Sequence, residues 1–229
     1  MTSEIATDVT ELEGGTVVVV RAMLIRDLPC VGVDGGELDR ATPARRRAFA
    51  SGRACAREAL AALGVGSVAL PPDANGVPRW PSGFTGSISH NDAVCCATAA
   101  RTADVVALGV DVERIVPFES ALVRRVCRTD ERARIARMPD LDGLWPNIVF
   151  SAKEAVYKCL SPRFGCFLEF EDVALDFTIQ SGSESGGFRV MNIVPGPWEG
   201  AARGLVGRWL IAGGHIFAIA EDRGVGNAV

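Results

Sequence analysis

Residues 150–158 read Phe-Ser-Ala-Lys-Glu-Ala-Val-Tyr-Lys, and they predict a short helix with two unlike faces. At 3.6 residues per turn the apolar side chains share one arc, which carries Ala152, Ala155, Val156, Cys159 and Leu160. The opposite arc carries two ammoniums, a carboxylate and a phenol, from Lys153, Glu154, Tyr157 and Lys158. The stretch therefore predicts a helix that gathers chargeable groups on one side.

The same residues also allow a purely structural interpretation. Ser151 and Glu154 have the spacing of a capping box, in which each side chain binds the backbone of the other residue. Glu154 and Lys158 have the spacing of an ordinary i,i+4 ion pair. Taken alone, the stretch leaves the structural and the functional interpretation equally open.

The composition is that of an ordinary globular protein. The 229 residues, 48% hydrophobic and 23% charged, suffice for one large domain or two small halves. The formal net charge of -4 indicates that the molecule as a whole does not bind nucleic acid or membranes, although local basic patches stay open. No apolar run has the length of a membrane span or a signal-peptide core, so we expect a cytoplasmic protein.

The cysteines do not suggest a metal site or a disulfide framework. No two of them form a CxxC pair, and no Cys/His group has zinc spacing. We therefore expect reduced thiols that act as small hydrophobic side chains. The seven are Cys30, Cys55, Cys95, Cys96, Cys127, Cys159 and Cys166.

A second informative stretch, VVALGVDVE at residues 105–113, predicts a strand that ends in alternation. A period of two places Asp111 and Glu113 on one face, roughly 7 Å apart along the strand. Two carboxylates at this distance can converge on one ion, and oxygen ligands without Cys or His favour Mg²⁺ or Mn²⁺. A strand end whose polar face meets water is an equally open interpretation.

Two segments are rich in arginine. A helix is predicted from about Pro43 to Leu63, where Arg45 and Arg53 lie about 80° apart around the axis. A solvated basic face is the simpler interpretation of these arginines. A second helical segment is predicted at residues 119–137, closed by Pro139. It carries Arg124, Arg125, Arg128, Arg132, Arg134 and Arg137.

The remaining segments predict strands and turns. A short strand over residues 86–90 ends in Ser89 and His90, and residues 93–100 return as its partner. Further strands are predicted at about 171–179, 187–194 and 206–220, the last folded into a hairpin at Gly213-Gly214. Taken alone, His90 at a strand end indicates only a hydrogen-bonded surface group.

Four stretches of the chain resemble a known family, two of them in a specific order and at a specific separation. Residues 109–113 (GVDVE) followed by residues 150–158 (FSAKEAVYK) are similar to the paired signature of the 4'-phosphopantetheinyl transferases. Trp80-Pro81 with residues 86–90 (GSISH) resembles the preceding segment in the long type that serves surfactin and enterobactin synthetases, and Arg45 to Arg53 resembles its early arginine helix. The resemblance covers roughly residues 43–160.

The resemblance implies an α+β fold. It consists of a pseudo-twofold arrangement of two similar α/β halves, each with a small antiparallel sheet packed on helices. We expect the halves at residues 1–112 and 113–229, in a protein active as a monomer. The family transfers 4'-phosphopantetheine from coenzyme A to a serine of an acyl or peptidyl carrier protein. The resemblance implies Mg²⁺, with Mn²⁺ as an alternative, in the cleft between the halves, and release of adenosine 3',5'-bisphosphate.

The resemblance also implies roles for individual residues. Asp111, Glu113 and Glu154 would hold the metal, and Glu154 is also a candidate base for the serine proton. The residues implied in catalysis are Glu154, Lys158 and Asp111. The residues implied in coenzyme A binding are Arg45, Arg53, Ser89 and His90 at the nucleotide end, with Lys153 and Lys158 at the pyrophosphate. The chain departs from the family at Asn75, where a basic residue is common, and Arg79 or Arg46 could replace it.

The partner is a carrier protein, which the resemblance implies to be small and acidic. The basic segment at 119–137 is the expected docking surface, with Arg124, Arg125 and Arg128 steering the carrier. A fatty-acid carrier, a polyketide or peptide synthetase domain and a siderophore synthetase domain all stay open. Two rival functions use the same residues: a Mg²⁺-dependent phosphohydrolase of a nucleotide, and a coenzyme A-binding protein without transfer activity.

Overall fold

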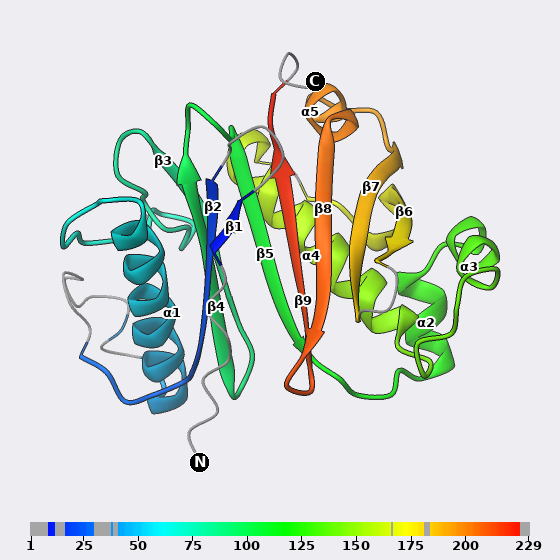
Figure 1. Cartoon of the computed structure of the whole chain (residues 1–229), viewed down its shortest axis with the longest axis horizontal. Helices are drawn as coiled ribbons and strands as arrows, with labels where there is room; N and C mark the ends of the chain where they lie inside the picture. Colours follow the sequence, from blue (N-terminus) through cyan, green and yellow to red (C-terminus); the bar gives the residue numbers. More distant parts are fainter. Residues whose placement is uncertain are drawn as a thin grey trace. The chain divides into compact units, whose positions relative to one another are not determined.

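The computed structural model describes residues 9–11, 17–29, 38, 41–165, 167–180 and 184–224. The chain forms two compact units, Met1–Leu108 and Gly109–Val229 (Figure 1). Strand β5 (Ala107–Arg114) contains this boundary and also the boundary expected from the sequence, between residues 112 and 113. None of the described helices is both long and apolar enough to cross a membrane.

The first unit packs one long helix against one face of a four-stranded antiparallel sheet (Figure 1). Its strands, in the spatial order β1-β2-β4-β3, are β1 (Val9–Glu11), β2 (Val17–Leu24), β4 (Val94–Arg101) and β3 (Phe84–His90). Small and apolar residues of the helix, Ala56, Ala59 and Leu60 among them, form a buried cluster with the strands. Burial of this face stabilises the unit.

The helix α1 (Pro43–Ala62) begins and ends where its sequence predicts. The Thr42 side chain accepts a hydrogen bond from the Arg45 backbone N–H at 3.3 Å, and Pro43 occupies the first helical position. At the other end Gly64 has a φ of 85°, which is unfavourable for residues with a Cβ. The strands at residues 86–90 and 93–100 are confirmed as β3 and β4, which pair antiparallel.

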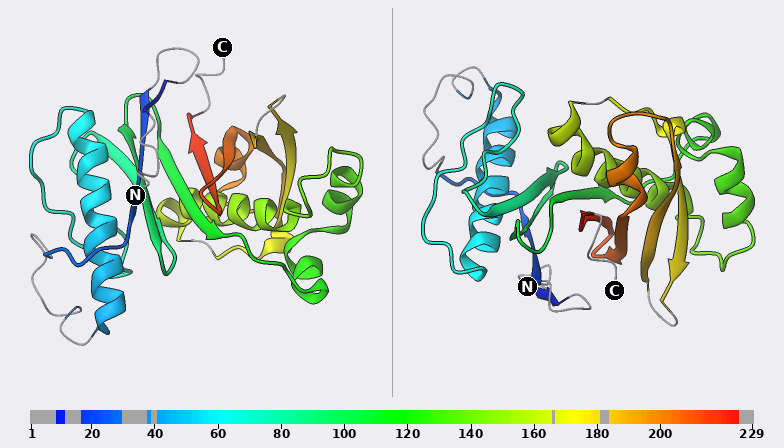
Figure 2. Two further views of the ribbon diagram at one scale, coloured as in Figure 1. Left: turned by 60° about the horizontal axis from the view of Figure 1, so that its bottom comes forward. Right: turned by 90° about the horizontal axis from the view of Figure 1, so that it is seen from above.

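The second unit has a five-stranded sheet with helix α4 (Trp145–Phe164) across one face, as Figures 1 and 2 show. The strands run in the spatial order β5-β9-β8-β7-β6. Besides β5 they are β6 (Val173–Ile179), β7 (Ser185–Ile193), β8 (Leu205–Ala212) and β9 (His215–Asp222). The helical elements besides α4 are α2 (Ser120–Val126), α3 (Thr129–Ile135), the 3₁₀ turn η1 (Phe170–Asp172) and α5 (Glu199–Arg203).

Aromatic packing and one tight turn fix this sheet. Trp145, at the start of α4, meets Trp209 of β8 edge-to-face with ring centroids 5.8 Å apart. The hairpin predicted at Gly213-Gly214 is confirmed, since Ala212 pairs with His215 and both glycines have positive φ angles of 56° and 75°. The expected α+β fold with small antiparallel sheets on helices is thus confirmed for both units.

Two helix predictions need correction. The helix predicted to start near residue 150 starts at Trp145 and has 20 residues, so Ser151 lies inside it and is no cap. The capping-box interpretation of Ser151 and Glu154 is therefore wrong. The helix predicted over 119–137 is two helices, because the backbone of Arg128 is not helical (φ -58°, ψ 156°). The Arg128 backbone N–H donates a hydrogen bond to the Glu131 carboxylate, and this bond caps the start of α3.

Candidate active site

Strand β5 and helix α4 approach each other closely at one glycine. A Cβ atom on Gly109 would lie 1.9 Å from the Ala155 carbonyl oxygen and 2.6 Å from the Cys159 backbone nitrogen. No side chain fits there, so the backbone of β5 rests directly on α4. The contact places the two residues that follow, Val110 and Asp111, beside the middle of the helix.

Asp111 is the buried acid of this region. Its side chain is 2% exposed, and the Lys158 ammonium donates a hydrogen bond of 2.6 Å to its Oδ1 atom. A charge-assisted bond of this length explains how a carboxylate stays buried on the strand. The residues Asp111 from β5 and Lys158 from α4, far apart in the sequence, are thus brought into contact as the paired motifs imply.

Two further carboxylates, Glu113 and Glu154, interact with this pair electrostatically. Burial, together with the Asp111 and Glu154 charges, raises the pKa of Glu113 from 4.5 to about 7, and Lys158 partly opposes this rise. The pKa of Glu154 is also raised, mainly by burial. The Lys158 charge opposes this rise, and the Asp111 charge adds to it. The three acids therefore repel one another, and Lys158 offsets only part of the rise in the pKa values of Glu113 and Glu154.

This donor set fits a divalent cation in its chemistry. Three carboxylates from one strand and one helix are the oxygen ligands that Mg²⁺ and Mn²⁺ prefer, and a cation would relieve their mutual repulsion. Within the described residues, however, no three acidic, His or Cys side chains are already gathered as a metal cluster.

Lys153 has a different environment from that expected for the polar arc. Its ammonium, 2% exposed, donates hydrogen bonds to Glu131 Oε2 at 2.8 Å, to the Val126 carbonyl at 2.9 Å and to the Phe170 carbonyl at 2.7 Å. The pKa of Lys153 is lowered, mainly by burial, and the Glu131 carboxylate opposes this lowering. Among the four residues of the arc, Lys153 is buried, whereas Glu154, Tyr157 and Lys158 are half-buried.

A cavity of about 190 Å³ opens beside Glu154. One wall comes from α4, a second from α2 and a third from the segment that leads through η1 into β6. Aromatic and aliphatic side chains predominate, and charged groups stand among them. The lining residues are Arg125, Lys153, Glu154, Tyr157, Phe167, Leu168, Glu169, Phe170 and Val173. The sequence-based prediction missed residues 167–173, because no periodicity or motif marks an irregular segment as a cavity wall.

In the first unit, Arg45 and Arg53 differ in exposure. Arg45 is exposed, whereas Arg53 is buried over the Phe49 ring and donates from Nε to the Leu70 carbonyl at 2.7 Å. Burial and the nearby Arg57 lower the pKa of Arg53 to about 10. Its Nη2 atom is buried without a hydrogen-bond partner in the described residues. A wholly solvated basic face is therefore excluded for Arg53 and fits Arg45.

The other candidates of the first unit lie at the end of β3 and in a nearby turn. Ser89 is buried and His90 is exposed, opposite Cys96 and Cys95 of β4. Asn75 is exposed in a turn where Asp73 Oδ1 accepts hydrogen bonds from the backbone N–H groups of Asn75 and Val77. Arg79 and Arg46 are both exposed, so neither is fixed as a substitute for a basic residue at position 75.

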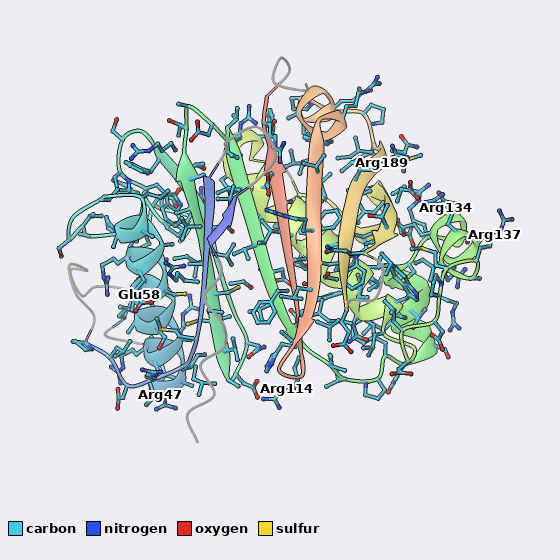
Figure 3. The ribbon with its side chains drawn as sticks, in the orientation of Figure 1. Arg47, Glu58, Arg114, Arg134, Arg137 and Arg189 are labelled. Atoms are coloured by element: carbon cyan, nitrogen blue, oxygen red, sulfur yellow. The ribbon has the colours of Figure 1, made fainter. Side chains whose placement is uncertain are left out.

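The arginines of α2 and α3 fall into two groups. Arg124 and Arg125 on α2 are exposed, and Arg125 makes a 3.7 Å ion pair with Glu169. Two others are more engaged: Arg128 binds Asp130 and the Glu171 carbonyl, and Arg134 binds Asp130 and the Leu175 carbonyl. Figure 3 shows Arg134 on α3 and Arg137 just beyond its end.

Comparison with known proteins identifies similar sequences over both units. Residues 35–100 match the model of the 4'-phosphopantetheinyl transferase N-terminal domain, and residues 107–195 match that of the 4'-phosphopantetheinyl transferase superfamily. The 4'-phosphopantetheinyl transferase Svp of Streptomyces mobaraensis is 36% identical over 202 residues, 85% of this chain and 80% of the relative. The transferase PptT of Mycobacterium tuberculosis is 31% identical over 77% of this chain and 79% of its own length. Enterobactin synthase component D of Salmonella typhi is 36% identical over 52% of this chain and 50% of its own.

Proposed function

The chain belongs to the 4'-phosphopantetheinyl transferase superfamily, whose enzymes modify carrier proteins, and we propose a Mg²⁺-dependent reaction for it. The 4'-phosphopantetheine group moves from coenzyme A to a serine hydroxyl of an acyl or peptidyl carrier protein. The serine oxygen bonds to the phosphorus that carries the pantetheine, and the pyrophosphate bridge breaks. Adenosine 3',5'-bisphosphate leaves. The observation that carries the proposal is the contact of Asp111 and Lys158 beside Glu113 and Glu154.

The three carboxylates and Lys158 would have different roles in the reaction. Asp111, Glu113 and Glu154 would hold the metal, which when bound supplies positive charge to the reacting phosphate oxygens. Lys158 would bind the pyrophosphate, and its half-buried ammonium, which keeps some exposure beside Asp111, supports this role. Glu154 is the candidate base for the serine proton, since burial raises its pKa toward the working pH of a general base.

The cavity beside Glu154 is the proposed binding site of the pantetheine arm. The arm is an uncharged chain of methylene and amide groups, and the aromatic and aliphatic lining offers it apolar contacts. Arg125, an exposed residue of the cavity wall that pairs with Glu169, would face the incoming carrier.

We assign the contacts with the nucleotide end to the first unit. Arg45, Arg53, Ser89 and His90 would bind the phosphates of that end. Arg53 supports this assignment, because its Nη2 has no hydrogen-bond acceptor among the described residues and guanidinium groups bind phosphate oxygens.

The carrier would approach α2. A small acidic carrier and a chain of net charge -4 need a local positive patch; Arg124 and Arg125 are exposed on α2, and Arg125 lines the cavity. Arg128 contributes less to such a patch than the sequence indicates, since it binds Asp130 and the Glu171 carbonyl.

Intact mass spectrometry tests the proposal directly. The protein is incubated with coenzyme A, Mg²⁺ and a panel of apo carriers from fatty-acid, polyketide and peptide synthetase systems. The expected result is that one or more carriers gain the mass of a single 4'-phosphopantetheine group. Pantetheinyl product without any carrier would instead indicate a phosphohydrolase. Coenzyme A binding without modification of any carrier would indicate a binding protein.

A further inference from the structure

Lys153 uses all of its hydrogen-bond donors inside the protein. An ammonium has three N–H groups, and here they bind the Glu131 carboxylate, the Val126 carbonyl and the Phe170 carbonyl at 2.7–2.9 Å. These acceptors belong to three different segments: α3, the end of α2, and η1. The side chain therefore joins α4 to each of them.

Glu131 is equally engaged. Its side chain is fully buried, its Oε2 accepts from Lys153 and from the Arg128 backbone N–H, and its Oε1 accepts from the Leu175 backbone N–H at 2.7 Å. The pair thereby connects α4 with α2, α3, η1 and β6. Figure 2 shows α2 and α3 beside α4 on the β6 side of the second unit.

The segments joined by this pair are also the walls of the cavity beside Glu154. Arg125 precedes Val126 on α2, Phe170 is the first residue of η1, and Val173 follows its last residue. The Lys153 ammonium donates hydrogen bonds to the backbone carbonyls at positions 126 and 170, one in each wall opposite α4. The pair thus sets the distance from α4, and from Glu154 next to Lys153, to both other walls.

We propose that Lys153 and Glu131 are a positioning pair that sets the width of the cavity beside Glu154, and that Lys153 does not bind the pyrophosphate of coenzyme A. The inference rests on the proposed function of that cavity as the binding site of the pantetheine arm. A turn of the ammonium toward a phosphate would leave the Glu131 charge buried without its cation, and the Val126 and Phe170 carbonyls would lose this donor. Breaking one side of a buried ion pair is strongly unfavourable.

Two substitutions and their combination test the pair. Lys153→Met removes the ammonium and keeps the length, whereas Glu131→Gln keeps the shape and an acceptor oxygen but loses the charge. Each single change is expected to lower kcat/KM for coenzyme A at least about tenfold, because displaced walls misplace the arm. The double variant should lose no more than the worse single variant, since the two residues act as one unit.

A matched control separates positioning from simple loss of stability. Glu221 is another buried acid of the second unit, 1% exposed and bound to Arg208 and Arg223, and it does not line the cavity. Glu221→Gln should lower the melting temperature like Glu131→Gln, with kcat/KM unchanged at a temperature where every variant is folded. Calorimetry should also show unchanged binding of adenosine 3',5'-bisphosphate to Glu131→Gln, because that product lacks the pantetheine arm.

Three results would overturn the inference: normal kcat/KM in Glu131→Gln, additive losses in the double variant, or the same kinetic loss in Glu221→Gln. Glu131→Gln alone suffices if Lys153→Met does not fold. If the wild-type protein modifies no carrier, the proposed function fails separately. Amide hydrogen exchange then tests the pair, with faster exchange expected at Arg128 and Leu175 in Glu131→Gln, and unchanged exchange counting against it.

Discussion

The Lys158 ammonium and the Asp111 carboxylate meet at 2.6 Å across the contact between α4 and β5. The two residues are 47 positions apart in the chain, and their contact joins the two stretches that resemble the family's paired signature. Because Gly109 lets the strand rest on the helix, the carboxylates of β5 and of α4 share one electrostatic environment. The predictions below follow from this contact and from the residues around it.

Removal of the Asp111 carboxylate is expected to abolish most turnover. Asp111→Ala loses a metal ligand and the partner of Lys158, and the cost in transition-state stabilisation is on the order of several kcal/mol. Steady-state transfer rates over a Mg²⁺ titration measure the loss. Asp176→Ala, which removes an acid bound to Arg189 on β7, is the control and should keep near-normal rates. Near-normal turnover of Asp111→Ala at low Mg²⁺ would contradict the metal assignment.

Glu154→Gln separates charge from shape at the centre of α4. The amide keeps the size of the side chain, but it cannot take the serine proton or offer a full charge to the metal. We expect transfer to fall at least about a hundredfold, as is typical for the loss of a general base. Thermal unfolding should change little, since Glu154 is not a cap. A variant with normal transfer in a carrier-modification assay would remove Glu154 from the mechanism.

The raised pKa of Glu113 gives the metal-free protein a pH-dependent stability. A carboxyl with a pKa of about 7 in the folded state, against an ordinary 4.5, favours folding while protonated. This contribution is complete below about pH 4.5 and is lost as the pH rises through about 7. In EDTA, the melting temperature of Glu113→Gln relative to wild type should therefore increase from pH 5 to pH 8. A difference that stays constant over this range would contradict the assignment.

The same carboxyl links metal binding to protons. Mg²⁺ competes with the proton for Glu113, so its apparent affinity for the wild-type protein should rise as the pH increases through about 7. Calorimetric titrations at two pH values measure this change, and Glu113→Gln should show a smaller dependence.

Gly109→Ala tests the close approach of β5 to α4. The added Cβ must push the strand from the helix and move Asp111 away from Lys158. Gly186→Ala is a matched control, because its Cβ would also lie 1.9 Å from a carbonyl oxygen, that of Thr178 on β6. Both variants should have lower melting temperatures. Only Gly109→Ala should need more Mg²⁺ for half-maximal transfer, and equal Mg²⁺ dependence in the two variants would rule out the positioning role.

Charge reversal on α2 tests carrier docking. Arg124→Glu with Arg125→Glu should raise the KM for the carrier and leave the KM for coenzyme A little changed, because both side chains are exposed. Added salt should weaken the carrier dependence of the wild type, since exposed charges are screened over about 8–10 Å. Arg189→Glu with Arg203→Glu makes the same charge change on β7 and α5. An equal effect of the control pair, or equal effects on both substrates, would contradict docking on α2.

The sequence by itself determined the local elements and the pairing of motifs. Thr42, Pro43 and Gly64 mark the ends of α1 through backbone chemistry that needs no distant contact. The alternation after Gly109 placed Asp111 and Glu113 on the same side of β5, and the helical period grouped the buried residues of α4. These features depend on neighbours within a few residues, which a sequence contains in full.

Only the tertiary structure decided the environment of the charged groups. The helical period assigned Lys153 to a polar arc, yet α2, α3 and η1 cover that side of α4 and bury its ammonium on Glu131. The break at Arg128 and the cavity walls at residues 167–173 likewise follow from contacts between distant segments. A helical or strand period specifies the direction in which a side chain points. Burial and ion pairing also depend on which residues of distant segments lie opposite that side chain, and the period does not specify these.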